Sequence, residues 1–112
     1  MTAESRGTLP REIPHEDGAF TAAHAMLLGA GLAAGSAEWL ELAFSDRLHE
    51  PYRPSPLLDE IRSDLPPGAV GATLSGSGPT VLVWAHGPEP CAAALAERHD
   101  DHRVLPLAVT ER

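Results

Sequence analysis

The stretch that decides the fold is Gly71-Ala72-Thr73-Leu74-Ser75-Gly76-Ser77-Gly78-Pro79-Thr80-Val81-Leu82-Val83-Trp84. Apolar and β-branched residues at its two ends predict two strands, and the small residues 75–78 between them predict the loop of a hairpin. Gly76 and Gly78 allow positive φ, so successive backbone N–H groups can turn toward one anion or ligand oxygen. A glycine-rich connection that binds nothing is the open alternative. No Lys follows the second Gly, which excludes the nucleotide-binding loop that ends in Gly-Lys-Ser/Thr.

Hydrophobic spacing outside the hairpin predicts helices over residues 18–34, 37–49, 57–65 and 91–99, and a last strand over residues 104–109. Asp17 is the predicted N-cap of the first helix, Gly35 is its stop, and Pro51 ends the second helix. Helices and strands that mix without strict alternation indicate an α+β fold, in which helices cover one face of a small antiparallel sheet. Residues 1–16 are polar and broken by prolines, so we expect a lead-in segment there and one folded domain over residues 17–112.

Composition and charge limit the classes of partner. A chain of 112 residues has the length of one domain. Its net charge of −8 leaves no basic stripe to neutralise phosphates, which argues against nucleic acid and anionic membranes as partners. The longest apolar run, residues 25–37, is interrupted by glycines and is too short to span a bilayer. Cys91 is the single cysteine and cannot form an internal disulfide, so we expect a cytoplasmic protein.

The candidate for ligand recognition is Arg53, in a proline-rich segment that follows the second predicted helix. Prolines at positions 51, 54 and 56 stiffen the chain around it. A guanidinium presents a planar fork of donors that matches a carboxylate, which is what recognition of a small amino acid requires. The alternative is a surface arginine paired with Glu50 or Asp46.

Two groups that contain histidine are weaker candidates. His49 carries an imidazole, a group that can act as a catalytic base, but a histidine at a helix C-terminus more often interacts with the helix dipole than with a substrate, so we assign no catalytic residue. The run His99-Asp100-Asp101-His102 has metal-ligating residue types. A zinc or iron site needs three or four converging ligands and the sequence offers no second cluster, so we expect a solvated turn and no metal.

Two strings in this sequence resemble the C-terminal part of the homoserine kinases, which belong to the GHMP family of small-molecule kinases. They are Leu74-Ser-Gly-Ser-Gly-Pro-Thr80 and, upstream, Asp46-Arg-Leu-His-Glu-Pro-Tyr-Arg53. Thr2, Arg6, Leu9 and Pro10 match a further pattern of that family, Thr-x-x-x-Arg-x-x-Leu-Pro. The resemblance implies a ferredoxin-like sheet backed by helices, whose first strand would precede Thr2 and so be missing here.

The same resemblance implies the roles of the site residues. Arg6 and Arg53 would hold the carboxylate of homoserine, and Gly76 would line the substrate site. Ser75, Ser77 and Gly78 would complete the pocket loop. The family implies ATP and Mg²⁺ as well, bound through a Pro-x-x-x-Gly-Leu-Gly-Ser-Ser-Ala loop at a helix N-terminus. That string is absent from this sequence, so ATP and Mg²⁺ would be bound by a missing N-terminal half.

The expected function is therefore that of the substrate-side domain of an ATP-dependent homoserine kinase. Such an enzyme makes O-phosphohomoserine for threonine biosynthesis, and we expect the isolated chain to be inactive. A GHMP kinase with another small alcohol as substrate is one alternative. A non-catalytic module that binds small molecules or forms a homodimer is the other, because a missing first strand would leave a sheet edge open for pairing.

Overall fold

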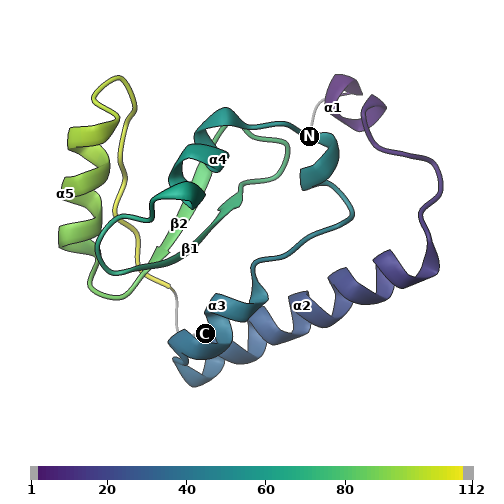
Figure 1. The fold of residues 1–112 in the computed structure, drawn as a ribbon, viewed down its shortest axis with the longest axis horizontal. Helices are drawn as coiled ribbons and strands as arrows, with labels where there is room; N and C mark the ends of the chain where they lie inside the picture. The colour runs from purple at the N-terminus through teal and green to yellow at the C-terminus, as the bar shows by residue number, and fades with distance from the viewer. Residues whose placement is uncertain (1–2, 110–112) are drawn as a thin grey trace.

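The computed structural model describes residues 3–109 and has the predicted α+β class, with a small antiparallel sheet and covering helices (Figure 1). The elements are, in chain order, α1 (Ala3–Gly7), α2 (His15–Ala34), α3 (Ala37–Ala43), the 3₁₀ turn η1 (Glu50–Tyr52), α4 (Pro56–Ser63), β1 (Ala69–Leu74), β2 (Val81–Ala85) and α5 (Pro88–Arg98). None of the helices within the described residues is long and apolar enough to cross a bilayer.

Strands β1 and β2 form the hairpin predicted around the glycine-rich loop. They pair antiparallel, with Thr73 opposite Leu82 and Gly71 opposite Trp84. The pairing is irregular between Ala69 and Gly71, where β1 carries an extra residue. Because side chains alternate along a strand, this register sends Ala72 and Leu74 to one face of the sheet and Gly71 and Thr73 to the other.

The hydrophobic core lies on the face of the sheet that α4 covers. Leu58 and Ile61 of α4 cluster there with Ala72 and Leu74 of β1, and all four are buried. The partly buried Leu95 of α5 packs against the same cluster. Leu58 and Ile61 are three positions apart on the helix, so one stripe of α4 supplies the contact.

The opposite face of the sheet is covered by Phe44, which follows α3. The rings of Phe44 and Trp84 are stacked, with their centroids 5.8 Å apart. Trp84 Nε1 also donates a hydrogen bond of 3.0 Å to Thr73 Oγ1, which satisfies the indole. A Cβ at Gly71 would overlap the Phe44 ring. Position 71 therefore has to be glycine for the ring to lie flat on the strand.

Helices α2 and α3 form the helical hairpin expected from the short break between them. Gly35 ends α2 with a φ of 65°, and the Ser36 N–H donates to Gly31 O at 3.0 Å, which confirms the predicted stop. Ser36 then caps α3, since its Oγ accepts from the Trp39 N–H at 3.2 Å. Gly31 is buried against Leu40, so a glycine sets the close approach of the two helices.

The predicted start of the first long helix is wrong. α2 begins at His15 and its N-cap is Pro14, so Asp17 lies in the first turn and donates its own N–H to Pro14 O at 3.0 Å. Proline is compatible with this boundary because the N–H that it lacks has no place in the helical hydrogen-bond pattern. Within the predicted lead-in, residues 3–7 form the short helix α1.

Two predicted elements in the rest of the chain also differ from the structure. The helix expected over residues 37–49 ends at Ala43, because the N–H groups of residues 48–50 bind the Asp46 carboxylate instead of helical carbonyls. Residues 104–109 form no strand. Their backbone makes no hydrogen bond to the backbone of any other described residue, and an extended segment becomes a strand only when it pairs.

Candidate functional site

The loop that joins β1 to β2 is held by hydrogen bonds within itself. The Ser75 N–H donates to Thr80 O at 2.9 Å, and the Gly78 N–H donates to Ser75 O at 2.9 Å. Gly76 has a φ of 58° and Gly78 a φ of 79°, so both glycines adopt the predicted left-handed conformation. A Cβ at Gly78 would lie 3.1 Å from Leu74 Cδ1, whereas a Cβ at Gly76 would meet nothing within 4 Å.

In the same loop, two backbone N–H groups are left without an acceptor among the described residues, and one carbonyl oxygen points toward the helical part of the chain. The N–H groups of Gly76 and Ser77 donate to none of the residues between 3 and 109. The carbonyl oxygen of Gly76 accepts a hydrogen bond of 3.3 Å from Nη1 of Arg53. The loop can therefore offer N–H groups to a ligand oxygen while its carbonyl fixes a cation beside it.

Arg53 is held in place by the turn that precedes it, and Asp46 organises that turn. The Asp46 carboxylate accepts from the N–H groups of Leu48 at 3.2 Å, His49 at 2.8 Å and Glu50 at 2.7 Å. Burial alone would raise the pKa of Asp46, but these hydrogen bonds and the nearby His49 together lower the pKa below its ordinary value. Asp46 is thus held as a carboxylate, and η1 begins four residues later, at Glu50.

The guanidinium of Arg53 lies inside the molecule, beside the loop. Only 7% of the residue is exposed. Besides its bond to Gly76, Nη1 lies 3.4 Å from His49 Nδ1. A guanidinium can only donate, so His49 Nδ1 accepts, and the Nε2 side of the ring faces Asp46 at 3.7 Å. Arg53 therefore belongs to a connected group that runs from Asp46 through His49 to the loop.

Glu50 and Arg62 make contacts that the sequence did not predict. The Arg62 guanidinium donates twice to Ala72 O, from Nε at 3.1 Å and from Nη2 at 2.9 Å. Nη2 also binds Glu50 Oε1 at 2.8 Å, while Glu50 Oε2 accepts from the Leu74 N–H at 3.0 Å. These two side chains thus provide hydrogen-bond partners for the backbone groups at the outer edge of β1. We call the pair Glu50 and Arg62 the edge clasp. Glu50 and Asp46, the two acids considered as surface partners of Arg53, are both committed to these other contacts.

The remaining predicted site residues lie as follows. Ser75 and Ser77 flank Gly76 in the loop and are half-buried. Arg6 lies on α1 with an exposed side chain, and its carbonyl accepts from the Leu9 N–H at 3.1 Å. Its convergence with Arg53 on one ligand stays a prediction. Thr2, which belongs to the same sequence pattern, lies outside the described residues.

The turn at residues 99–102 gathers histidines without forming a metal centre. The rings of His99 and His102 meet edge to face, with centroids 5.8 Å apart, and His102 Nδ1 lies 2.8 Å from the carboxylate of Asp101. Within residues 3–109, no three His, Cys, Asp or Glu side chains lie close enough together to hold a metal ion.

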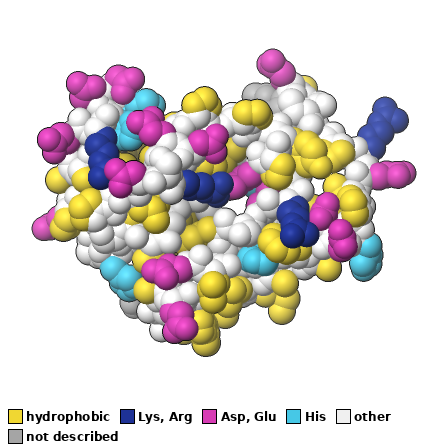
Figure 2. Space-filling view, in the orientation of Figure 1, with side chains coloured by type: hydrophobic (Ala, Val, Ile, Leu, Met, Phe, Trp, Pro, Cys, Tyr) yellow, Lys and Arg dark blue, Asp and Glu magenta, His cyan; other side chains and the backbone are white. Residues whose placement is uncertain are grey.

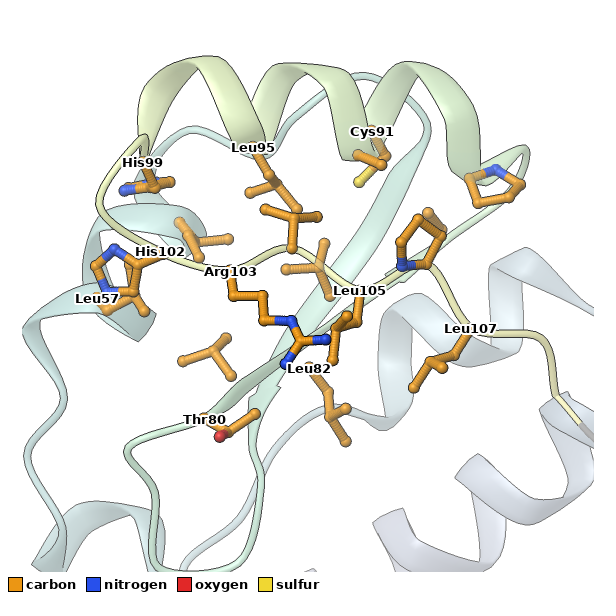
Figure 3. Close-up of a pocket in the computed structure, with 18 of the residues that line it drawn as sticks. Leu57, Thr80, Leu82, Cys91, Leu95, His99, His102, Arg103, Leu105 and Leu107 are labelled. Carbon is orange, nitrogen blue, oxygen red and sulfur yellow. The ribbon is translucent and has the colours of Figure 1, made fainter.

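Two hollows among the described residues lie next to each other and share Leu57, Pro79 and His102 in their linings. A small one of about 200 Å³ touches Ser77 and Gly78 together with Pro54 and Pro56. A larger one of about 490 Å³ lies between β2, α5 and residues 102–107 (Figure 3). The larger hollow is lined mainly by apolar residues and by neither Arg53 nor Gly76, so its size does not make it the ligand site.

The match of a known family model assigns this hairpin and its helices to the C-terminal domain of one class of small-molecule kinases. The family model described as GHMP kinases C terminal matches residues 22–103. The chain therefore belongs to the GHMP kinase family, as the resemblance of its motifs implied.

Relatives within that family are homoserine kinases. The one from Gloeobacter violaceus is 42% identical over 99 residues, which are 86% of this chain and 32% of the relative. The one from Rhodococcus erythropolis is 38% identical over 112 residues, 98% of this chain and 35% of the relative. The one from Thermus thermophilus is 39% identical over 117 residues, 98% of this chain and 40% of the relative. The chain thus spans about a third of the length of these curated relatives.

The fold has a counterpart among solved structures. The crystal structure of homoserine kinase from Cytophaga hutchinsonii superposes with a TM-score of 0.73 at 24% sequence identity. The match covers 90% of this chain and 34% of that one. It establishes the fold of the C-terminal domain.

Proposed function

We propose that this chain is the substrate-side domain of an ATP-dependent homoserine kinase and that Arg53 binds the carboxylate of homoserine. The observation that carries the proposal is the hydrogen bond between Arg53 Nη1 and Gly76 O. It joins the two segments that resemble the homoserine kinases, although they lie far apart in the sequence. Arg53 is also almost fully buried, so its guanidinium is surrounded by protein groups and not by bulk water.

The chemistry of the two segments suits a small hydroxy amino acid. A guanidinium held on one side by a carbonyl has a fixed plane, so it can meet a carboxylate with two parallel hydrogen bonds. The backbone N–H groups of Gly76 and Ser77 can donate to a second oxygen of the ligand. Arg6 would add a second cation, and Ser75 and Gly78 would shape the wall of the pocket.

The rest of the reaction would take place on polypeptide outside this chain. ATP supplies the phosphoryl group, and Mg²⁺ offsets the charge of its phosphates. We assign both to an N-terminal kinase half, because this sequence contains no glycine-rich phosphate loop at a helix N-terminus. In this division, the chain positions the substrate and does not transfer a proton, so it has no catalytic residue of its own. We place the protein in the cytoplasm, in threonine biosynthesis.

The proposal can be tested with one conservative pair of variants. The chain would be combined with the N-terminal region of the Rhodococcus erythropolis homoserine kinase, and KM for homoserine would be measured in the presence of ATP and Mg²⁺. Arg53→Lys should raise KM about tenfold or more, because an ammonium cannot replace a bidentate guanidinium. Arg47→Lys is the matched control, since Arg47 lies in the same segment but is exposed and paired with Asp17.

Equal KM values for the two variants would contradict the role of Arg53. Turnover by the purified 112 residues alone would contradict the assignment of ATP to another half. Homoserine binding in calorimetry without turnover in the mixture would favour the alternative of a non-catalytic binding module.

A further inference from the structure

We propose that the edge clasp is a pair of positioning residues, which hold Arg53 where it meets the substrate carboxylate. The hydrogen bonds of the two clasp side chains go to β1 and to each other, so the pair acts on the ligand only through Arg53. The effect on homoserine rests on the proposed function. The hold of the clasp on Arg53 rests on contacts within this chain alone.

The first step of the argument is that the backbone of Glu50 carries Arg53. Glu50 is the first residue of η1, and its carbonyl oxygen accepts a hydrogen bond of 3.1 Å from the Arg53 N–H. The Glu50 N–H in turn donates to Asp46 Oδ2 at 2.7 Å. Pro51 lies between Glu50 and Arg53 and fixes one backbone dihedral angle of the turn. A displacement of Glu50 would therefore move Arg53 with it.

The second step is that the side chain of Glu50 is anchored next to the loop that Arg53 contacts. Glu50 Oε2 accepts from the N–H of Leu74 at 3.0 Å, and Leu74 precedes Gly76 by two residues. Arg53 Nη1 donates to Gly76 O at 3.3 Å. The same two segments of chain are thus joined twice, by the bond from Leu74 to Glu50 and by the bond from Arg53 to Gly76. The first bond is the shorter one, so it sets the spacing at which the second can form.

The third step is that Arg62 fixes the Glu50 carboxylate in this orientation. Arg62 Nη2 lies 2.8 Å from Glu50 Oε1, and the same guanidinium donates to Ala72 O from Nε at 3.1 Å and from Nη2 at 2.9 Å. The Glu50 side chain is only 10% exposed. A carboxylate that has left water needs an opposite charge or donors to hold it there. Without Arg62, we expect Glu50 to turn toward solvent and release its contact with β1.

The position of Arg53 matters because a guanidinium recognises a carboxylate through its geometry. Two parallel hydrogen bonds form only when the plane of the guanidinium is correctly placed. An arginine side chain that is not already ordered has to be ordered when the ligand binds, which weakens binding. Loss of the clasp should therefore raise KM for homoserine and leave KM for ATP unchanged.

The first measurement follows the Arg53 side chain by NMR in the purified 112-residue chain. Arg62→Ala and Glu50→Gln should each move the Nε–Hε cross-peak of Arg53, because the turn that carries it shifts against the loop. Arg98→Ala is the matched control. Arg98 also donates to a backbone carbonyl, Asp64 O at 2.8 Å, and its side chain is 39% exposed against 36% for Arg62. Its contacts do not involve the clasp, so the Arg53 cross-peak should stay in place.

The second measurement is kinetic and uses the mixture with the N-terminal region of the Rhodococcus erythropolis homoserine kinase. Arg62→Ala should raise KM for homoserine about three- to tenfold, while Arg98→Ala leaves it unchanged. In a chain that already carries Arg53→Lys, the addition of Arg62→Ala should change KM by less than about twofold, because two residues that act through one contact are not additive.

An Arg53 cross-peak that responds to neither Arg62→Ala nor Glu50→Gln would overturn the proposal. An unchanged KM for homoserine in Arg62→Ala would overturn it too, provided that Arg53→Lys raises KM. A full rise of KM on the Arg53→Lys background would show that the clasp does not act through Arg53. If the cross-peak moves but Arg53→Lys leaves KM unchanged, the clasp holds Arg53 and the proposed function of Arg53 fails.

Discussion

At the scale of single residues, Asp46 determines how the site is built. Its carboxylate ends the helical path after α3, because it binds three successive N–H groups that a continuing helix would have used. It also carries His49 and Arg53 toward the glycine-rich loop. The hydrophobic spacing of Leu40, Phe44 and Leu48 predicted a longer helix, and that spacing says nothing about a side chain that competes for the backbone.

We expect Asp46→Asn to destabilise the protein by about 1–2 kcal/mol at neutral pH, because an amide accepts more weakly than a carboxylate. The folded pKa of Asp46 is lowered, so its contribution is present above the unfolded value of about 3.9 and is lost as the pH falls through the lower, folded pKa. The difference between wild type and variant should therefore shrink in that acidic range. Urea unfolding at several pH values measures it.

The control for this prediction is Asp100→Asn, an exposed residue of the turn after α5. It should change the free energy of unfolding by less than about 0.5 kcal/mol. A difference for Asp46→Asn that stays constant down to the acid transition would show that charge plays no part.

At the scale of elements, the hairpin was predictable and the elements around it were less so. β-branched residues and glycines that can adopt a positive φ determine a hairpin locally, so residues 71–84 alone were sufficient to predict it. The prediction of a strand over residues 104–109 was wrong because a strand forms only where a second segment pairs with it through backbone hydrogen bonds. The edge clasp was also missed, since Glu50 and Arg62 meet β1 only through the tertiary fold.

Two glycines give a matched test of packing against the sheet. Gly71→Ala should cost about 2–3 kcal/mol, because the new methyl group overlaps the Phe44 ring on a buried strand. Gly29→Ala, at an exposed position in α2 with nothing within 4 Å of the new Cβ, should instead stabilise the protein by about 0.5–1 kcal/mol. Thermal unfolding of both variants measures this. A neutral Gly71→Ala would mean that Phe44 does not lie on β1 in solution.

The edge clasp should protect one particular amide. In Glu50→Ala, the Leu74 N–H loses its acceptor and should exchange about tenfold faster or more, since a buried donor is left unsatisfied. The amide of Thr73, which points toward β2, serves as the internal reference and should change little. Equal acceleration of both amides would show that the whole hairpin has loosened.

At the scale of the whole molecule, two parts of the surface are incompletely covered. Leu95 of α5 packs against the core, and Cys91 of the same helix is buried. On α2 and α3, Met26, Trp39 and Leu42 are exposed, and hydrophobic side chains gather over these helices in Figure 2. The sequence placed Arg53 and the glycine-rich loop in one site because both belong to motifs of one family. It could not reveal which surfaces stay exposed, because that depends on how the helices pack in the tertiary fold.

Cys91 reports whether α5 is docked. The residue is 3% exposed, and burial raises the pKa of its thiol, partly offset by Arg98. Alkylation at pH 8 should therefore be about a hundredfold slower in the native chain than in urea, since reaction requires local opening. A native rate equal to the rate in urea would show that α5 is detached.

The edge clasp also limits how such chains can polymerise. A hairpin whose two strand edges are both unpaired can bind a further hairpin at each edge without limit, which is how cross-β filaments grow. Glu50 and Arg62 occupy the outer edge of β1. Another strand can therefore pair only with the edge of β2. Any association through the sheet therefore terminates after one addition, and a concentrated solution of this protein should yield discrete particles and no fibres.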